Sequence, residues 1–129
     1  MENKGTIMLN ELRDKVHENA IAHGFYDDAN VNIPEKLMLI VSELGEAMEA
    51  YRKEHYADWE GYKNLLNKNI EYESGAFERL IKDSYADEIS DTIIRLLDLC
   101  GYMTIDIDRH VELKMKYNES RPYKHGKIC

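Results

Sequence analysis

The stretch "LIVSELGEAMEA", residues 39–50, has the pattern of a buried helix but also carries three carboxylates. Its apolar residues recur every three or four positions, which predicts that one helical face packs into a core. Glu43, Glu46 and Glu49 follow at intervals of three. Neighbouring members therefore lie one turn apart, where a like-charged pair costs roughly 0.2–0.5 kcal/mol. A helix that keeps this repulsion is expected to have positive charge beside it.

Helical periodicity extends over most of the chain, and no segment shows the alternation of a strand. The pattern predicts an all-α fold, a bundle of four or five helices in a single domain covering residues 1–129. Pro34 marks a helix start and Gly101 a helix end. The expected helices are residues 7–22, 35–53, 76–100 and 105–117, with a weaker pattern over 62–70 and an irregular basic tail over 118–129.

Two of these helices are strongly apolar and are expected to form most of the core. The expected core positions are Leu37, Ile40, Val41, Leu44 and Met48 in the helix over 35–53, and Leu80, Ala86, Ile89, Ile93, Leu96, Leu97 and Cys100 in the helix over 76–100. Helices this apolar in a short chain rarely bury all of their surface within one subunit. We therefore expect a homodimer or a homotetramer.

The composition restricts the classes of function. A net charge of −8 over 129 residues argues against a duplex nucleic-acid binder, whose surface is basic. We find no apolar run long enough for a membrane span and no secretory leader pattern, so we expect no membrane association. The two cysteines, Cys100 and Cys129, are placed as reduced thiols, which makes a cytoplasmic location the expectation.

A second acidic pair lies in "SYADEISDTIIRLL", residues 84–97, where Glu88 and Asp91 repeat the spacing of Glu43 and Glu46. If the two helices pack antiparallel, four carboxylates can converge, and they then need a counter-charge. Mg²⁺, with Mn²⁺ as a possible substitute, prefers such oxygen ligands. A di-iron site would need Glu-x-x-His motifs, and the chain has none. Ordinary solvated acidic faces remain the alternative.

The C-terminal part has the opposite charge. From Arg109 onward the chain carries six Lys or Arg and two Asp or Glu. Lys and Arg are the usual partners of phosphate. Carboxylates for a magnesium ion, with cations for phosphate, indicate phosphoanhydride or phosphoester chemistry; a basic solubilising end is the alternative. The candidate phosphate-binding residues are Lys114, Asn118, Arg121 and Lys127.

These motifs resemble those of the all-α nucleoside triphosphate pyrophosphohydrolases, the MazG-like group that includes dimeric dUTPases and phosphoribosyl-ATP pyrophosphatases. The family motif E-x-x-E followed by E-x-x-D reads here Glu43-Leu-Gly-Glu46 and Glu88-Ile-Ser-Asp91. The ending "KMKYNESRPYKHGK" and the loop "HGFYDD" are also similar to family segments. One departure is the segment from Tyr51 to Ser84, which is longer than usual for the family.

The resemblance implies hydrolysis of a nucleoside triphosphate to the monophosphate and pyrophosphate, in a nucleotide-cleansing role. Glu43, Glu46, Glu88 and Asp91 would hold Mg²⁺, and Glu46, with Glu43, would act on the attacking water. Family members also assemble as oligomers.

Three aromatic residues, Phe25, Tyr26 and Trp59, are candidates for stacking on the base. Two other functions remain open. One is a helical module that binds a nucleotide or partner without turnover, and the other is a phosphoribosyl-ATP pyrophosphatase.

Overall fold

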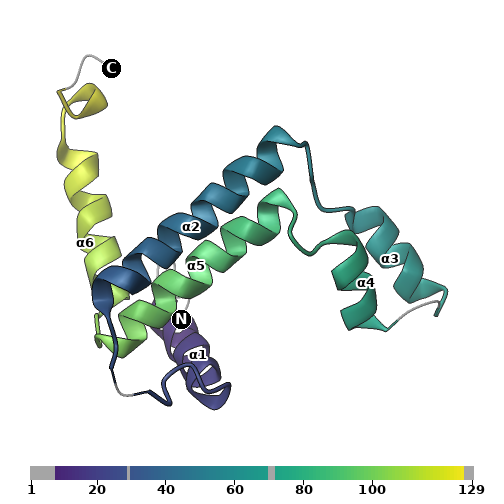
Figure 1. Ribbon diagram of the computed structural model, residues 1–129. Helices are drawn as coiled ribbons and strands as arrows, with labels where there is room; N and C mark the ends of the chain where they lie inside the picture. Colours follow the sequence, from purple (N-terminus) through teal and green to yellow (C-terminus); the bar gives the residue numbers. More distant parts are fainter. Residues whose placement is uncertain (1–7, 29, 70–71, 127–129) are drawn as a thin grey trace, which may run out of the picture. The chain divides into compact units, whose positions relative to one another are not determined.

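The computed structural model describes residues 8–28, 30–69 and 72–126, and all regular structure within them is helical (Figure 1). The all-α class is confirmed, although six α-helices replace the four or five expected. None of the described helices is long and apolar enough to cross a membrane. The elements are α1 (Leu9–Ala22), α2 (Ile33–Arg52), α3 (Trp59–Asn67), α4 (Glu73–Leu80), α5 (Tyr85–Tyr102), α6 (Ile107–Ser120) and a 3₁₀ turn, η1 (Tyr123–Gly126).

The prediction of one helix over residues 76–100 was wrong, because a turn separates α4 from α5. Asp83 has a φ of +63°, a left-handed conformation that ends a helix. The buried Ser84 hydroxyl then accepts from the backbone N–H of Asp87 at 3.4 Å, while the Asp87 carboxylate accepts from the N–H of Asp83 at 2.9 Å. This exchange is close to a capping box. The Ser-x-x-Asp spacing was visible in the sequence but was not used.

The chain divides into two compact units, one of residues 1–29 and 97–129 and the other of residues 30–96. We call them the terminal unit and the central unit. The terminal unit contains α1, the end of α5 and α6. The central unit contains α2, α3, α4 and most of α5.

In the terminal unit, α1 and α6 cap each other's first turns. The Asp108 carboxylate accepts from the backbone N–H groups of Leu9 and Asn10, at 2.6 and 3.1 Å. In return, the Asn10 side-chain oxygen accepts from the N–H groups of Ile107 and Asp108, at 2.9 and 3.3 Å. These bonds satisfy N–H groups that a helix start otherwise leaves without acceptors.

A second polar network joins α1 to the end of α5. His17 Nδ1 lies 2.8 Å from one Asp98 oxygen, and the Tyr26 hydroxyl donates to the other at 2.8 Å. The Tyr26 ring also stacks on Tyr102, with ring centroids 5.5 Å apart. Both ends of the Tyr26 side chain are therefore used within the terminal unit.

Gly101 does not end the helix as expected but lies inside α5, where α1 crosses it closely. A Cβ atom at position 101 would lie 2.6 Å from the His17 Cβ and 3.4 Å from the Arg13 carbonyl oxygen. Glycine is therefore needed for the close approach of the two helices.

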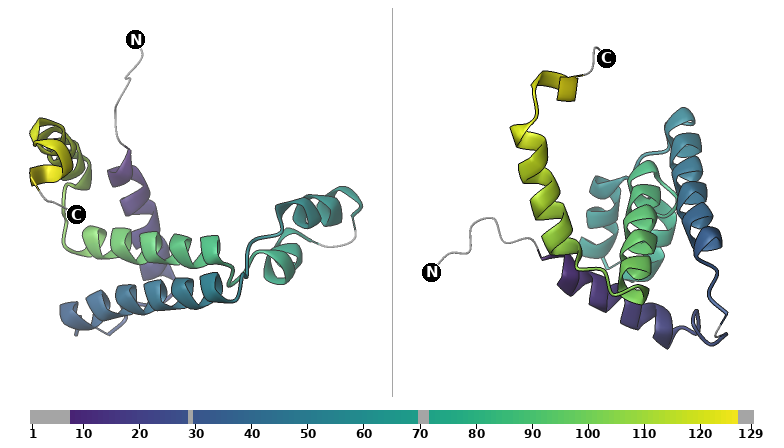
Figure 2. Two further views of the ribbon diagram at one scale, coloured as in Figure 1. Left: turned by 90° about the horizontal axis from the view of Figure 1, so that it is seen from above. Right: turned by 90° about the vertical axis from the view of Figure 1, so that its left-hand side faces the viewer.

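In the central unit, α2 and α5 run antiparallel and side by side (Figures 1 and 2). The buried residues of α2 are Ile40, Ala47 and Ala50, which follow each other at helical spacing. Of the five core positions expected in this helix, only Ile40 is buried. The others, Leu37, Val41, Leu44 and Met48, are 45–60 % exposed. The apolar arc of α2 is broader than one neighbouring helix covers, and α5 packs against its small-residue side.

On α5 the burial also differs from the expectation. Leu97 and Cys100 are buried as expected, but Ile93 and Leu96 are 47 % and 44 % exposed. In the part of α5 that belongs to the central unit, the buried positions are Glu88 and Thr92, which lie one turn apart. Polar side chains thus occupy positions that an apolar pattern would assign to the core.

The long segment between α2 and α5 forms a helical hairpin, α3 and α4. Two backbone hydrogen bonds anchor its base, from the Asp58 N–H to the Leu80 carbonyl at 3.0 Å and from the Tyr85 N–H to the His55 carbonyl at 2.8 Å. Ala76, fully buried, lies on α4. The described parts of this segment, residues 51–69 and 72–84, therefore belong to the central unit.

We expect Gly101→Ala to destabilise the protein by about 1–3 kcal/mol, because the added methyl group has no space against α1. The loss would appear as a lower midpoint of denaturant unfolding. Gly45→Ala is the matched control, since a Cβ there meets nothing within 4 Å. Gly45 lies inside α2, so that change should stabilise the protein by roughly 0.5–1 kcal/mol. Equal effects of the two substitutions would contradict the close approach of α1 and α5.

Candidate metal centre

Three carboxylates converge between α2 and α5. Glu43 lies on the buried side of α2, between Ile40 and Ala47, and its side chain is only 12 % exposed. Glu88 and Asp91 project from the first half of α5, and Glu88 is 5 % exposed. One oxygen from each of the three carboxylates lies within 4.8 Å of the others. The spacing of three residues on α5 places Glu88 and Asp91 on the same side of the helix, which allows both to face Glu43.

The charges at this site are only partly balanced by the protein. Arg95 Nε donates to Glu43 Oε1 at 2.8 Å, but the Arg95 side chain is 44 % exposed and meets only one oxygen of the group. The Oε2 atoms of Glu43 and Glu88 are buried and have no hydrogen-bond partner among the described residues. Buried carboxylate oxygens without donors are costly. The site therefore needs a shared proton or a cation.

The pKa values of Glu88 and Asp91 are raised, which is consistent with a shortage of counter-charge. Burial, with proton sharing and repulsion from neighbouring carboxylates, raises the pKa of Glu88 to about 8. Burial and the charges of Asp87 and Glu43 raise the pKa of Asp91. For Glu43 burial again acts upward, but the hydrogen bond from Arg95 and those shared with Glu46 and Glu88 outweigh it and lower the pKa. The Glu88 contacts with Glu43 and Glu46 are hydrogen bonds only while a proton is shared.

Glu46, the fourth predicted ligand, lies at the edge of the site. Its side chain is exposed on α2, and it is not a member of the three-carboxylate group. It nevertheless contributes to the pKa of both Glu43 and Glu88. Glu49, the third glutamate of the opening stretch, instead forms ion pairs with Arg52 and Lys53 at 3.6 and 3.4 Å. The three evenly spaced glutamates of α2 thus have three different environments.

Arg95 is the one residue of the site that sequence reasoning missed. It follows Asp91 by four positions and Glu88 by seven, so all three lie on one side of α5. This spacing could have predicted that an Arg side chain lies near the acidic pair. It was overlooked because residues 93–97 were interpreted as core.

The predicted phosphate-binding residues belong to the terminal unit. Lys114 Nζ and the Arg121 guanidinium lie 5.1 and 5.5 Å from the centroid of the Tyr117 ring, both as cation–π contacts. The Asn118 carbonyl accepts from the Arg121 N–H at 3.2 Å. Lys127 lies outside the described residues. The three described residues are close to one another at the end of α6, which extends to Ser120 rather than to position 117.

The predicted base-stacking aromatics are dispersed. Phe25 is 75 % exposed, and Tyr26 makes the contacts with Asp98 and Tyr102 described above. Trp59 begins α3 and packs edge-on against Tyr62, with centroids 5.6 Å apart. Phe25 and Tyr26 lie in the terminal unit and Trp59 in the central unit.

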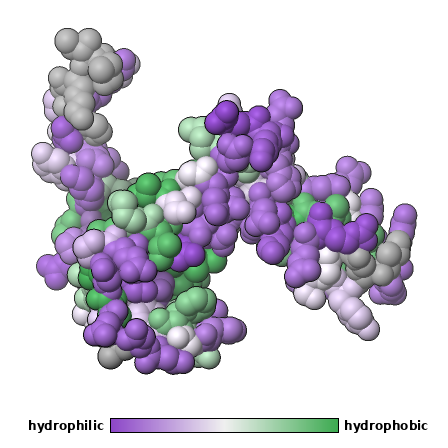
Figure 3. Space-filling model, in the orientation of Figure 1, coloured by the Kyte–Doolittle hydropathy of each residue, from purple (hydrophilic) through white to green (hydrophobic). Residues whose placement is uncertain are grey.

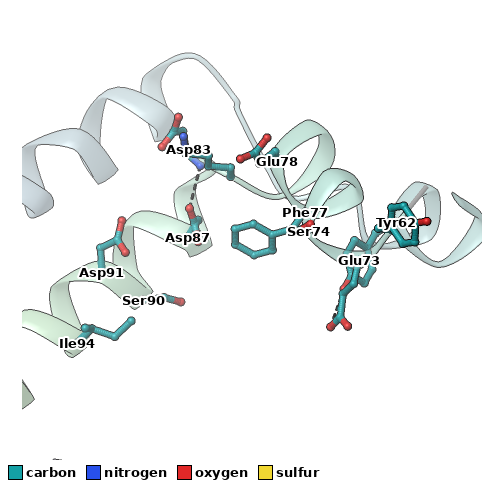
Figure 4. Close-up of a pocket in the computed structure, with 12 residues that line it drawn as sticks. Tyr62, Glu73, Ser74, Phe77, Glu78, Asp83, Asp87, Ser90, Asp91 and Ile94 are labelled. Atoms are coloured by element: carbon teal, nitrogen blue, oxygen red, sulfur yellow. Dashed lines mark hydrogen bonds between the residues drawn. The ribbon is translucent and has the colours of Figure 1, made fainter. Parts of the chain in front are cut away.

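A cavity of about 960 Å³ lies beside the carboxylates in the central unit (Figure 4). It is formed by the α3–α4 hairpin and the outer side of α5, and Asp91 belongs to both the cavity and the carboxylate group. The lining residues are Tyr62, Tyr72, Glu73, Ser74, Phe77, Glu78, Lys82, Asp83, Asp87, Ser90, Asp91 and Ile94. Sequence reasoning did not find it, because no pattern in the segment before Ser84 indicated how it folds against α5.

Comparison of the chain with protein-family models, with curated proteins and with solved structures gives no match.

We expect the metal-free protein to lose stability as the pH rises from about 5 to about 8. In the unfolded chain Glu88 ionises near its ordinary pKa of 4.5, whereas in the fold it keeps its proton until about pH 8. Its contribution is therefore fully present below the ordinary pKa and is lost as pH rises through the raised one, by at most about 1.4 kcal/mol per pH unit. Denaturant unfolding in a chelator across this range measures the loss.

Glu88→Gln is the control, because its amide stays neutral over the whole range. Its stability should change less over the same pH interval, so the difference between the two proteins isolates Glu88. Parallel pH profiles for the two proteins would contradict the raised pKa. Added Mg²⁺ should restore the wild-type stability at pH 8, since a cation replaces the proton.

Proposed function

We propose that the chain is a Mg²⁺-dependent nucleoside triphosphate pyrophosphohydrolase, which converts a (d)NTP and water into the (d)NMP and pyrophosphate in nucleotide-pool cleansing. The observation that carries the proposal is the carboxylate group between α2 and α5. Glu43, Glu88 and Asp91 bring oxygens within 4.8 Å of one another. The Oε2 atoms of Glu43 and Glu88 are buried without a donor among the described residues.

The residues of this group fit a hard divalent cation. All of its donors are carboxylate oxygens, the type of ligand that Mg²⁺ prefers, with Mn²⁺ as a substitute. A cation there would offset the repulsion that raises the pKa of Glu88. A group of three carboxylates also leaves coordination positions for phosphate oxygens and water.

We assign the roles by exposure. Glu43, Glu88 and Asp91 would hold the cation, with Glu46 as a further ligand on the solvent side. Bound Mg²⁺ supplies Lewis-acid polarisation of the phosphate and activates water. Glu46 is exposed beside the group, which suits it to accept the proton of the attacking water, with Glu43 as the second candidate. Arg95 holds Glu43 ionised through its hydrogen bond.

The phosphates would be neutralised by the basic end of the chain. Lys114, Asn118, Arg121 and Lys127 are the proposed partners, and charge-assisted bonds from Lys and Arg suit phosphate oxygens. Lys114 and Arg121 both contact Tyr117, which places two of these cations at one ring. Electrostatic stabilisation and positioning would then carry most of the catalysis.

We also propose that the chain acts as a homodimer or homotetramer. The exposed stripe of Leu37, Val41, Leu44 and Met48 continues along α2, and apolar residues reach the surface over this helix in Figure 3. Each position lies three or four residues from the next, so the stripe follows one side of the helix. Such a stripe can pair with the same stripe of a second copy around a two-fold axis.

We expect pyrophosphate release from at least one (d)NTP with Mg²⁺. Glu43→Gln and Asp91→Asn should each lower kcat/KM by at least about 100-fold, because the metal supplies several kcal/mol of charge stabilisation. Glu49→Gln is the matched control, since Glu49 only forms surface ion pairs on the same helix. The measurement is a colorimetric phosphate screen with added pyrophosphatase over all standard (d)NTPs, dUTP and modified nucleotides. Phosphoribosyl-ATP is included as a biosynthetic alternative.

Two results would contradict this proposal. Full activity of both Glu43→Gln and Asp91→Asn would show that these two carboxylates are not needed to bind the metal. Saturable nucleotide binding with no product for any substrate would identify a binding module instead of a hydrolase.

We expect Val41→Lys combined with Met48→Lys to reduce the assembly to monomers, because charged side chains in the stripe would oppose its pairing. Ser42→Lys is the control, since Ser42 is an exposed polar residue of the same helix. Light scattering coupled to size-exclusion chromatography gives the mass of each protein. An unchanged mass in the double variant would place the interface elsewhere.

A further inference from the structure

The cavity between α4 and α5 continues from the carboxylate group, because Asp91 belongs to both. Its volume of about 960 Å³ is within the range of small-molecule sites. All of its lining residues lie in the central unit. A ligand whose phosphates were held at Glu43, Glu88 and Asp91 would therefore have this cavity as the adjoining space for the rest of the molecule.

The charge of the lining determines which end of a nucleotide fits. Five carboxylates line the cavity against one cation, Lys82. Figure 4 shows the carboxylates on α4, on the turn that follows it and on α5. Negative charge of this density repels phosphate and attracts groups that donate hydrogen bonds. The five are Glu73, Glu78, Asp83, Asp87 and Asp91.

An aromatic ring projects among these carboxylates. The Phe77 side chain points from α4 toward Asp87 and Ser90 of α5 (Figure 4) and is 37 % exposed. A half-exposed ring of this kind offers one face for stacking on a base. Glu78 is the next residue on α4, and its carboxylate forms no hydrogen bond or ion pair with any residue that the structure describes. The lining of the cavity thus includes both a stacking face and a hydrogen-bond acceptor.

We propose, building on the pyrophosphohydrolase function, that this cavity is the nucleobase subsite and that it selects bases with an exocyclic amino group. An ionised carboxylate only accepts hydrogen bonds. The amino groups of cytosine, adenine and guanine donate to it, as when Glu or Asp accepts from cytosine N4. Uracil and thymine present a carbonyl oxygen in place of the cytosine amino group, and two acceptors repel. The site thus discriminates dCTP from dUTP.

This assignment gives a role to the long segment before α5. Without α4, the outer side of α5 would have no facing wall, and Asp87 and Asp91 would lie on an open surface. Phe77 of α4 then takes the stacking role that sequence reasoning gave to Phe25, Tyr26 or Trp59.

The test is the binding of nucleoside monophosphates, which report base recognition without turnover. Isothermal titration with Mg²⁺ should give a Kd for dCMP roughly tenfold or more below that for dUMP. Phe77→Ala should weaken both ligands about tenfold through lost stacking. Glu78→Gln should reduce the preference for dCMP, because an amide can donate to the uracil carbonyl. Glu60→Gln is the matched control, an exposed glutamate of α3 outside the cavity.

The outcomes separate this inference from the function on which it rests. Equal binding of dCMP and dUMP, or equal turnover of dCTP and dUTP, overturns the base selection and leaves the hydrolase intact. Unchanged affinities in Phe77→Ala together with an unchanged preference in Glu78→Gln overturn the location. Binding that prefers dCMP and depends on Phe77, with no pyrophosphate released from any nucleotide, supports the subsite and overturns the hydrolase. Unfolding midpoints of all variants verify that each one is folded.

Discussion

The burial of Glu88 against Glu43 between two antiparallel helices is the constraint around which the central unit is organised. Among the described residues, Arg95 is the cation that hydrogen-bonds to the group, and it reaches a single oxygen of Glu43. Burial and the neighbouring carboxylates raise the pKa of Glu88, and its Oε2 atom has no hydrogen-bond partner among the described residues. Apolar side chains at these positions would favour stability, because buried charges without enough counter-charge destabilise a fold. This shortage of positive charge is the basis of our proposal that the cluster holds a cation.

The packing of α2 and α5 serves the same arrangement. The buried side of α2 has Ala47 and Ala50 next to Glu43, and small side chains leave room for carboxylates between the two helices. Larger apolar residues such as Val41 and Met48 lie on the adjoining side, where they remain exposed. The same helix thus has one side that carries Glu43 and another side whose apolar residues are exposed. The separation of these two sides explains why α2, although strongly apolar, contributes few residues to the core.

The α3–α4 hairpin extends the site outward. Its base is tied to the start of α5 by the bond between Tyr85 and His55, and Phe77 and Glu78 line the same cavity as Asp91 of α5. In our proposal, the cation and the base would be recognised by opposite means. Negative oxygens would hold the cation through charge, whereas stacking and hydrogen bonds to acceptors would hold the base.

The sequence by itself determined the helical class, the approximate extents of most helices and the matched spacing of Glu43, Glu46, Glu88 and Asp91, because helical periodicity and i, i+3 spacing are local properties. It did not determine which apolar residues are buried, since the apolar arc of α2 is wider than α5 covers and only packing selects the side. The close approach at Gly101 and the contact of Arg95 with Glu43 depend on residues that are distant in sequence. The turn at Asp83 depends on a local capping pattern that the prediction did not consider. Tertiary structure alone decided that three carboxylates meet and that a cavity adjoins them, because both require α2, α4 and α5 to pack together.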